Sequence, residues 1–284
     1  MDLLTTLSES EKKQWEAEIQ TQRKRLIQSP HFFVEQIVNE GVPYQKENIT
    51  LYIEQVRSQA YELYLKEELV FHKHMINHLL LENPYASNVL SHAIAEHLDE
   101  NRFPKQEDLA KVVGQSAGYL TPYIYGLCLS TTNSRRSRSG RTFEHIVKHV
   151  IDNIYAYPFQ SQADLGNAFY KKNNLGKLVD GIMPSGEHFY VDRPSCVFIT
   201  MKTSLRERWQ EVVEEQQRTN IPIIYLLTLD PSLSENTVKR LAEHNIYLVL
   251  PFNEKQKFSS FQSVLSFEQF FNDKLRLQSA HWHL

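Results

Sequence analysis

The apolar residues in the first part of the chain recur at the three- and four-residue spacing that is typical of amphipathic helices. Ser8 or Ser10 can cap a first helix, and Pro30 ends it. We therefore expect residues 1–130 to form an all-helical N-terminal region. The helices expected in this region cover residues 8–28, 32–39, 48–83 and 86–98.

Beyond residue 130 the pattern changes, because short apolar runs bounded by turn residues alternate with amphipathic segments. Such runs indicate buried strands, and strands that alternate with helices indicate a mixed or parallel sheet flanked by helices. The sequence therefore predicts an α/β domain over residues 131–284. Its expected strands cover residues 177–182, 196–201, 223–228 and 246–250, and its expected helices cover 143–154, 206–218 and 234–244.

Composition narrows the class of protein. Cys128 and Cys196 lie far apart and form no Cys-x-x-Cys motif, which argues against a disulfide framework and against a cysteine-based zinc site. The first residues, Met1 to Leu4, carry no basic or apolar leader, and no apolar run approaches the length of a membrane span. We expect a cytoplasmic protein without a membrane partner.

One segment is strongly basic, although the formal net charge of the chain is −3. Residues 134–141 hold four arginines in eight positions, with no acidic residue among them. The segment is interpreted as a loop, either solvated or in contact with DNA phosphates or the minor groove. The candidate DNA-binding residues in it are Arg135, Arg136, Arg138 and Arg141.

Residues 106–126 have the pattern of a helix-turn-helix motif. Ala110 stands where that motif favours a small residue, and Gly114 where it favours a turn glycine. Any two short helices with a glycine between them give the same pattern. A helix pair that serves packing is therefore preferred to a DNA-reading element.

Two polar residues stand at the ends of neighbouring expected strands. Asp180 lies in an otherwise apolar strand, and Lys202 follows directly after another. A carboxylate can hold a cation that lowers the pKa of a bound water, and a lysine can orient the nucleophile or stabilise developing charge. This is the minimum for metal-assisted phosphodiester hydrolysis. Mg²⁺ usually takes a second carboxylate, but Thr200 occupies the position two residues before the lysine where nucleases usually carry it.

The residues after Lys202 add a second pattern. Arg206-Glu207-Arg208 precedes an expected helix that bears Glu211, Glu214 and Glu215. Arginine forms bidentate hydrogen bonds with guanine O6 and N7, and glutamate accepts from the amino group of cytosine. Two arginines around one glutamate therefore match a half-site of CCGG. An exposed helix start is the alternative, although arginines oppose the helix dipole there.

With these residues the sequence resembles the CCGG family of type II restriction endonucleases, which includes enzymes that cut CCNGG. The resemblance covers residues 134–251 and rests on the pattern Lys-x3-Arg-Glu-Arg-x6-Glu from Lys202 to Glu215. Many members have a proline where this chain has Val179, but that position supplies no ligand. The resemblance implies a restriction-endonuclease-like mixed sheet flanked by helices, preceded by the helical N-terminal region.

The resemblance also implies catalytic roles. Glu215, which lies 13 residues after Lys202, takes the place of a metal-binding acid that has moved from the strand to the next helix. Asp180 and Glu215 would then hold Mg²⁺, Glu144 would assist from an upstream helix, and Lys202 would orient the attacking water. The residues that would read the CCGG bases are Arg206, Glu207 and Arg208.

The activity that the resemblance implies is cleavage of both strands of double-stranded DNA at a palindrome containing CCGG. Within the family, the member that this chain resembles most cuts W/CCGGW. The expected products are 5′-phosphates and a four-base 5′ overhang. A palindromic target implies a two-fold homodimer, with a higher oligomer on DNA left open. The expected setting is the cytoplasm of a bacterium that also carries the cognate methyltransferase, and residues 1–130 would serve dimerisation or DNA contact.

Two other functions stay open. One is a structure-specific repair or junction nuclease with the same core fold, which would have no need of the Arg-Glu-Arg triplet. The other is a DNA-binding regulator that uses residues 106–126.

Other titratable residues have weaker cases. His74 and His78 have the spacing of a metal pair on a helix but are interpreted as a surface face. His145 and His149 are candidate phosphate contacts. Glu187 and Asp192 are expected in a hairpin between the two active-site strands, where either is an alternative acid.

Overall fold

The protein was examined as a computed structural model, which describes residues 7–99, 101, 103–176, 179–205, 209–219 and 221–283. The chain forms two compact units, one of Met1–Ser29 and Tyr61–Arg138 and the other of Pro30–Ala60 and Ser139–Leu284. Two helices contribute residues to both units, α3 (Ile49–Glu82) and α6 (Thr121–His149). The boundary expected near residue 130 lies inside α6. Within the described residues, every helix is too short or too polar to serve as a membrane span.

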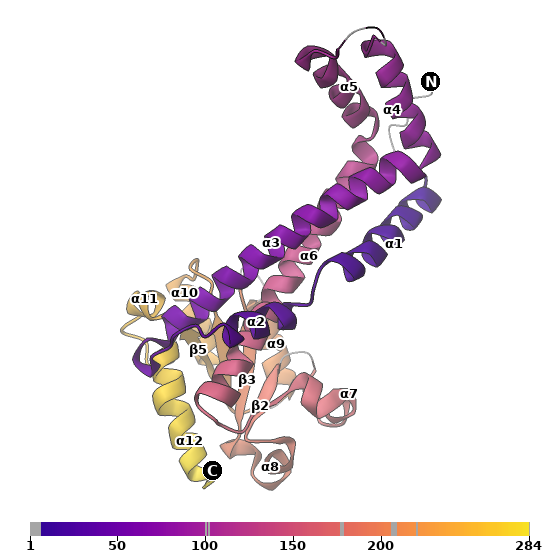
Figure 1. The fold of residues 1–284 in the computed structure, drawn as a ribbon. Helices are drawn as coiled ribbons and strands as arrows, with labels where there is room; N and C mark the ends of the chain where they lie inside the picture. Colours follow the sequence, from indigo (N-terminus) through magenta and orange to yellow (C-terminus); the bar gives the residue numbers. More distant parts are fainter. Residues whose placement is uncertain are drawn as a thin grey trace. The chain divides into compact units, whose positions relative to one another are not determined.

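The first unit is built from helices (Figure 1). The helix α1 (Glu9–Leu26) begins at Ser8, whose side chain and that of Glu11 form a capping box. Trp15 of α1 donates a hydrogen bond from Nε1 to the carbonyl of Tyr123 at 2.9 Å. The other helices of this unit are α4 (Pro84–His97), α5 (Gln106–Tyr119), and parts of α3 and α6. Residues 106–126 do contain a helix junction, but it lies around Leu120, where α5 ends and α6 begins, and the predicted turn glycine, Gly114, lies inside α5.

The second unit contains a six-stranded mixed sheet with the strand order β1-β2-β3-β4-β5-β6. The pairs β1–β2 and β2–β3 are antiparallel, whereas the strands from β3 to β6 run parallel. The strands are β1 (Gln160–Ser161), β2 (Gly181–Met183), β3 (Val197–Lys202), β4 (Ile224–Thr228), β5 (Ile246–Leu250) and β6 (Val264–Ser266).

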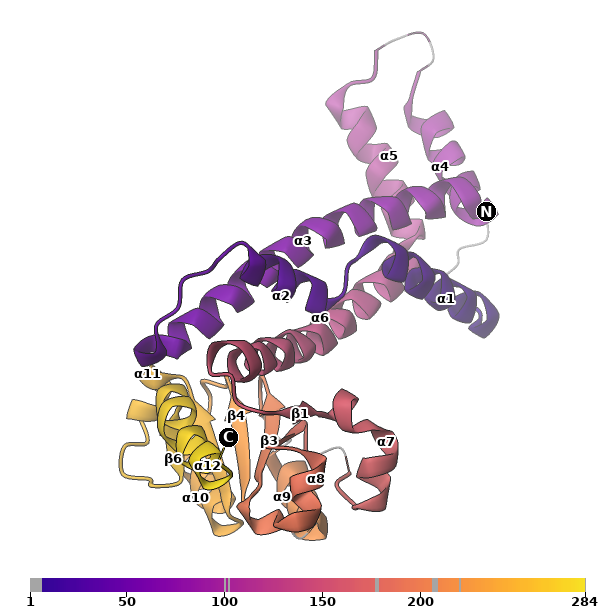
Figure 2. The same cartoon turned by 60° about the horizontal axis from the view of Figure 1, so that its bottom comes forward.

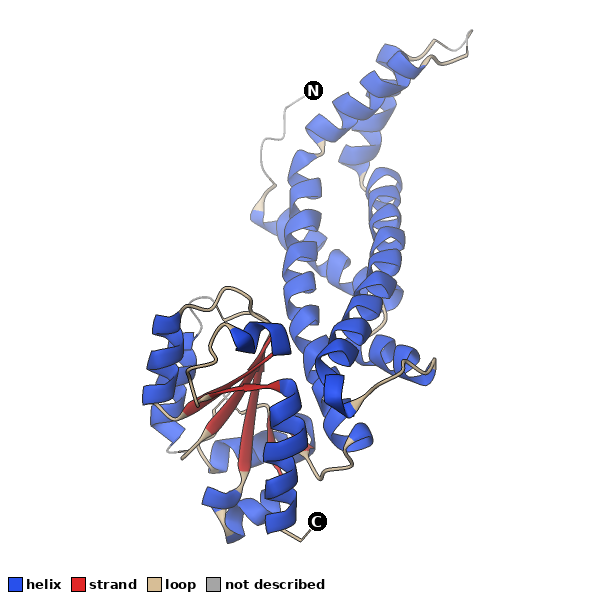
Figure 3. Ribbon diagram, turned by 90° about the vertical axis from the view of Figure 1, so that its left-hand side faces the viewer, coloured by secondary structure: helices blue, strands red, loops and turns tan. Residues whose placement is uncertain are grey.

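Helices flank this sheet, as Figures 2 and 3 show, which confirms the predicted fold class. The α-helices of the unit, besides parts of α3 and α6, are α2 (Pro30–Asn39), α7 (Gln162–Lys172), α8 (Gly186–Val191), α9 (Trp209–Thr219), α10 (Glu235–Glu243), α11 (Phe252–Gln256) and α12 (Leu275–His281). Short 3-10 or π segments are η1 (Lys46–Asn48), η2 (Val150–Ile154), η3 (Arg193–Ser195) and η5 (Gln269–Lys274).

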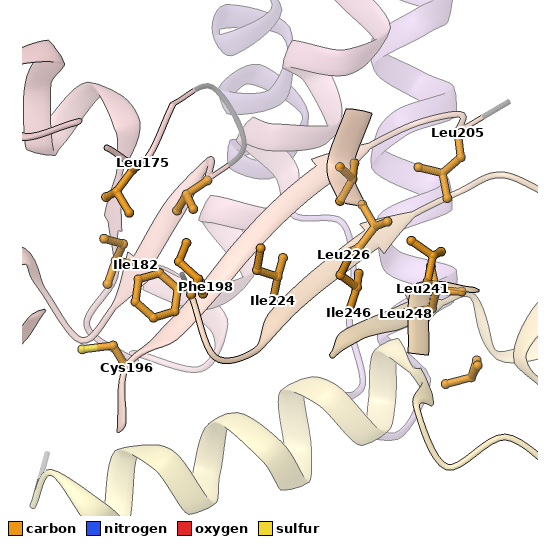
Figure 4. Close-up of a cluster of buried hydrophobic side chains, with 14 of the residues drawn as sticks. Leu175, Ile182, Cys196, Phe198, Leu205, Ile224, Leu226, Leu241, Ile246 and Leu248 are labelled. Atoms are coloured by element: carbon orange, nitrogen blue, oxygen red, sulfur yellow. The ribbon is translucent and has the colours of Figure 1, made fainter. Parts of the chain in front are cut away.

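Alternate residues of the strands fill two different layers. On one face, Phe198, Leu226 and Leu248 are buried in a cluster that also takes Val212 of α9 and Leu241 of α10 (Figure 4). On the other face, Tyr225 packs its ring 5.2 Å from that of Phe270 in η5. Since successive side chains of a strand point to opposite faces, burial on both faces explains why these strands read as continuous apolar runs.

The start of α3 belongs to the second unit through contacts that are remote in sequence. The backbone amide of Thr50 donates a hydrogen bond to Glu268 Oε1 at 2.9 Å, and the side-chain Nδ2 of Asn272 donates one to the carbonyl of Lys46 at 2.7 Å. Both acceptor–donor pairs join η1 or the first turn of α3 to the η5 region. These bonds help to fix the N-terminal end of α3 on the sheet domain.

Two local expectations were wrong. The basic segment 134–141 is helical, because it lies inside α6, and it is not a loop. The connection between β2 and β3, expected to be a hairpin with Glu187 and Asp192, contains α8 and η3 instead. Ser185 caps α8 by accepting a hydrogen bond from the His188 amide, which favours a helical turn over a tight hairpin.

Candidate active site

The antiparallel pairing of β2 with β3 places Asp180 beside the end of β3. Gly181 is in register with Ile199, and the amide of Asp180 donates to the Ile199 carbonyl at 2.8 Å. The Asp180 carboxylate therefore reaches the last residues of β3. Its Oδ2 accepts from the Met201 amide at 2.6 Å and from Thr200 Oγ1 at 3.3 Å, and it lies 3.4 Å from Lys202 Nζ. The structure thus brings together the acid and the lysine that the sequence singled out.

Burial governs the electrostatics of this pair. The side chain of Asp180 is 13% exposed and that of Lys202 is 23% exposed. Desolvation raises the pKa of the Asp180 carboxyl, while the charge of Lys202 and the hydrogen bond from Met201 act in the opposite direction. A carboxylate held in such a place is stabilised by added positive charge.

Glu144 belongs to the same electrostatic group. It lies on the last turns of α6, which pack against the sheet (Figure 2). Burial raises the pKa of Glu144, and the charge of Asp180 raises it further, while Lys202 and Arg141 lower it. Two carboxylates that disfavour each other's ionisation therefore face one lysine.

Glu215 lies on α9, close to the segment that leads to Asp180. Its Oε1 is 3.8 Å from the guanidinium of Arg218, and a Cβ added at Gly176 would lie 3.5 Å from that oxygen. Glu211 and Glu214 on the same helix are exposed, whereas Glu215 is half-buried. Among the described residues, no three acidic, histidine or cysteine side chains are grouped closely enough to hold a metal ion. Glu215 is thus near the site but is not assembled with Asp180 and Glu144 into one cluster.

The donor set at Asp180 fits a hydrated hard cation. The hydrogen bonds to Asp180 described above all use Oδ2, so Oδ1 has no donor among the described residues. Tyr170 on α7 is 4% exposed, and its hydroxyl has no hydrogen-bond partner in the described part of the chain. Burial raises the pKa of Tyr170, and the charge of Asp180 raises it further. Mg²⁺ takes carboxylate oxygens and keeps several waters, so it would use Oδ1 and its waters could satisfy the tyrosine. Nothing in the local sequence pattern singles out Tyr170 as a functional residue.

The predicted DNA-binding residues lie in different parts of the chain. Arg206, Glu207 and Arg208 lie outside the described residues. Arg141 is exposed on α6 and acts electrostatically on Glu144. Arg135 and Arg138 belong to the first unit and have partners there.

In the first unit, Arg135 donates from Nε to both carboxylate oxygens of Glu68 at 2.9 and 3.0 Å. Arg138 donates to the carbonyl of Gln28 and lies over the Tyr64 ring at 4.8 Å. Arg136 between them is exposed. A DNA contact by Arg135 or Arg138 would compete with these intramolecular bonds.

The histidines are held by protein partners. His74 Nε2 lies 3.1 Å from Gln22 Oε1, and His78 Nε2 lies 3.5 Å from Glu18 Oε1. These contacts with α1 support a structural role for this face of α3. Burial lowers the pKa of His145, whose ring also packs 4.9 Å from that of His31. A histidine that is neutral at pH 7 is a weak phosphate ligand.

The alternative acids in the β2–β3 connection differ in environment from Asp180. Glu187 is exposed, and Asp192 lies 3.9 Å from His281 Nε2. Within the described residues, neither contributes to the electrostatics of Asp180 or Glu144. Of the described acids, Asp180 and Glu144 are therefore the stronger candidates.

A mixed sheet flanked by helices, with an acid and a lysine at neighbouring strand ends, defines a restriction-endonuclease-like protein. Comparison with known families agrees, because the family described as EcoRII C terminal matches residues 109–271. Since this match covers more than half of the sequence, the chain belongs to the EcoRII C-terminal family.

Two curated relatives are type II restriction enzymes. SsoII of Shigella sonnei is 37% identical over 203 residues, which cover 71% of this chain and 64% of SsoII. EcoRII of Escherichia coli is 22% identical over 219 residues, which cover 69% of this chain and 51% of EcoRII. The chain therefore matches less than two thirds of the length of either relative.

Among solved structures, the chain is similar to metal-depleted Ecl18kI in complex with uncleaved DNA. The TM-score is 0.78 with 28% sequence identity, and the match covers 97% of this chain and 86% of Ecl18kI. A second complex of Ecl18kI, with uncleaved, modified DNA, gives a TM-score of 0.79 over 96% of this chain. The likeness thus includes the helical first unit as well as the sheet domain.

Proposed function

We propose that the protein is a Mg²⁺-dependent type II restriction endonuclease. The observation that carries this proposal is the half-buried Asp180–Lys202 pair at neighbouring ends of β2 and β3, whose charges also act on Glu144, in a chain of the EcoRII C-terminal family. SsoII and EcoRII, which belong to the same class by name, support the activity. Double-stranded DNA is the proposed substrate, which the DNA complexes of Ecl18kI support.

In this proposal Asp180 and Glu215 hold Mg²⁺, Glu144 assists, and Lys202 orients the attacking water. Bound Mg²⁺ would supply a water of lowered pKa and charge neutralisation at the scissile phosphate. Asp180 Oδ1 accepts no hydrogen bond within the described ranges and would take the cation, and the lysine ammonium stands at hydrogen-bond distance from Oδ2. Glu215 would use Oε2 for the cation, because Oε1 faces the guanidinium of Arg218 at 3.8 Å.

The proposed target is a palindrome that contains CCGG, with W/CCGGW as the form that the sequence resemblance favours. The support is the triplet Arg206-Glu207-Arg208, whose two donor forks and one acceptor match two G·C pairs per half-site. The same triplet can read the CC and GG steps of an interrupted CCNGG site, so both arrangements are compared in the experiment below. Cleavage would leave 5′-phosphates and a 5′ overhang.

A palindromic substrate requires one active site per strand, so the proposed working form is a homodimer. A higher oligomer on DNA and a role of residues 1–130 in dimerisation or DNA contact are part of the same proposal. The proposed location is the bacterial cytoplasm, beside a methyltransferase that protects the host site.

The function is tested by incubating phage DNA with the protein and Mg²⁺ and sequencing the termini of the fragments. Discrete fragments with 5′-phosphates and a shared CC/GG-containing site support the proposal, and matched duplexes with CCGG, CCNGG or scrambled sites identify the target. Nicking that follows DNA structure and ignores sequence would indicate a repair or junction nuclease. Binding without cleavage would indicate a regulator.

Base reading by the triplet is tested separately. Arg206→Ala or Arg208→Ala should weaken binding to the target by roughly 1–3 kcal/mol each, and Glu207→Ala should also weaken it, since the cytosine amino groups lose their acceptor. Binding to scrambled DNA should change much less, because phosphate contacts dominate it. Equal losses on both DNAs would argue against a base-reading role.

A further inference from the structure

The turn that follows β4 places a buried carboxylate beside the chain that leaves β3. Lys202, the last residue of β3, is in register with Thr228, the last residue of β4. Two residues later, Asp230 is 3% exposed. Its Oδ2 accepts a hydrogen bond from the backbone amide of Leu205 at 2.6 Å. The end of β4 thus contacts both ends of the segment 202–205.

The second oxygen of Asp230 closes its own turn. Oδ1 accepts from the amide of Ser232 at 2.9 Å and from the Ser232 hydroxyl at 2.5 Å. The amide of Asp230 donates to Thr228 Oγ1 at 3.2 Å. An asparagine could close such a turn equally well. It could not also accept at the position of Oδ2, because one of its two terminal atoms is a donor. The turn and the Leu205 contact together therefore favour a carboxylate over an amide at this position.

Leu205 is fixed by its side chain as well. It is fully buried in the cluster that includes Leu226 and Leu241 (Figure 4). A residue that is held by both its backbone and its side chain has little freedom. Since Leu205 is bonded to Arg206 in the chain, its position sets the point from which the Arg-Glu-Arg triplet starts.

We propose that Asp230 is a positioning residue for DNA recognition, which fixes Leu205 so that the triplet begins at a constant place relative to Lys202. The inference rests on the proposed function, because it gives the triplet its base-reading role. Segments that are ordered before binding lose less conformational entropy in the complex. A looser anchor should therefore weaken binding to the target more than binding to unrelated DNA, which depends on phosphate contacts.

The test compares Asp230→Asn with Ser232→Ala in the full chain. The first change keeps the size of the side chain but removes one of its two acceptors. The second removes a hydrogen bond from the same carboxylate and leaves the Leu205 contact intact, so it is the matched control. Affinities for the target duplex and for a scrambled duplex are measured without Mg²⁺, together with the melting temperature.

We expect Asp230→Asn to bind the target about tenfold more weakly or worse, with scrambled DNA bound nearly as by the wild type. Ser232→Ala should keep the wild-type ratio between the two DNAs, even where its melting temperature falls. An unchanged ratio in Asp230→Asn, or an equal loss of the ratio in both variants, overturns the proposal.

Hydrogen exchange at the Leu205 amide, measured without DNA, tests the anchor independently of the proposed function. The amide should be protected in the wild type and exchange faster in a folded Asp230→Asn variant. Rapid exchange in the wild type overturns the anchor even if the proposed function holds. If the wild type protects the amide but binds target and scrambled DNA equally, the proposed function has failed, and the recognition role of Asp230 fails with it.

Discussion

The pair Arg135–Glu68 separates a structural role of the basic segment from a role in DNA binding. Glu68 is 3% exposed, and both of its oxygens accept from Arg135 Nε, with further hydrogen bonds from the Arg135 guanidinium and the Tyr64 hydroxyl. Burial alone would raise the pKa of Glu68, but the hydrogen bonds from Arg135 and Tyr64 hold it below its usual value. Arg135→Ala would leave this carboxylate buried after the loss of three of these four hydrogen bonds.

The expected cost follows from burial. Removing one partner of a fully buried ion pair costs about 3–5 kcal/mol, whereas an exposed pair contributes about 0–1 kcal/mol. The Arg135 side chain is 45% exposed, so water can replace part of its contribution. We expect a loss of about 2 kcal/mol in the free energy of unfolding and a drop of about 5 °C in melting temperature.

The matched control is the neighbouring Arg136→Ala, since Arg136 is exposed and makes no hydrogen bond or ion pair in the described part of the chain. Its stability should stay within about 0.5 kcal/mol of the wild type. Thermal and urea melts measure both variants, and the salt dependence of DNA binding is recorded beside them. Equal melting temperatures for the two variants would refute the reasoning. A salt slope reduced by about one in Arg135→Ala would instead show that this arginine contacts a phosphate.

The remaining predictions concern the site and the cysteines. Asp180→Ala and Lys202→Ala should each lower the cleavage rate by about a hundredfold or more while target binding without Mg²⁺ persists in electrophoretic shift assays; wild-type rates would move the active site elsewhere. Glu215→Gln should reduce cleavage far more than Glu211→Gln, because Glu215 is half-buried beside the Asp180 segment whereas Glu211 is exposed; sensitivity at Glu214 instead would shift the metal-binding role by one residue along the helix. Burial, together with the charge of Asp192, raises the pKa of Cys196 to about 11. Iodoacetamide at pH 8 should therefore label the exposed Cys128 and spare the buried Cys196. Rapid labelling of both cysteines, measured by mass spectrometry, would contradict the burial of Cys196.

The pairing of Asp180 with Lys202 could be predicted from sequence because a polar residue at the end of an apolar strand is visible in the local pattern. Asp180 and Lys202 stand out in this way, and the structure places them 3.4 Å apart. Tyr170 does not stand out, because it follows Phe169, and two adjacent aromatic residues are typical of a hydrophobic core. Its nearness to Asp180 depends on how α7 packs beside the sheet, which no local pattern records.

The basic segment shows how remote contacts override local composition. Serines and a glycine between arginines suggested a loop, but arginine is a good helix former. Glu68, Gln28 and Tyr64 provide partners for this segment when it is helical. Glu68 lies 67 residues from Arg135, and Gln28 lies 110 residues from Arg138. The local sequence around these arginines therefore does not reveal their partners.

The assignment of the start of α3 to the sheet domain was equally hidden. The hydrogen bonds from Thr50 to Glu268 and from Asn272 to Lys46 join residues that are 218 and 226 positions apart. A helix can be recognised from its own periodicity, but the surface on which it packs is a property of the whole fold. Helices were therefore predicted better than the division of the chain into units.

The antiparallel pairing of β2 and β3 has a consequence for how such enzymes can diverge. The separation of Asp180 from Lys202 in space is set by the register of the two strands, whereas their separation in sequence is set by the connection that contains α8 and η3. Val191 in this connection is 79% exposed, and Tyr190 is 56% exposed. Longer surface connections cost little stability. Insertions there could accumulate without moving the acid from the lysine, so related chains can share one catalytic geometry while their motifs differ widely in length.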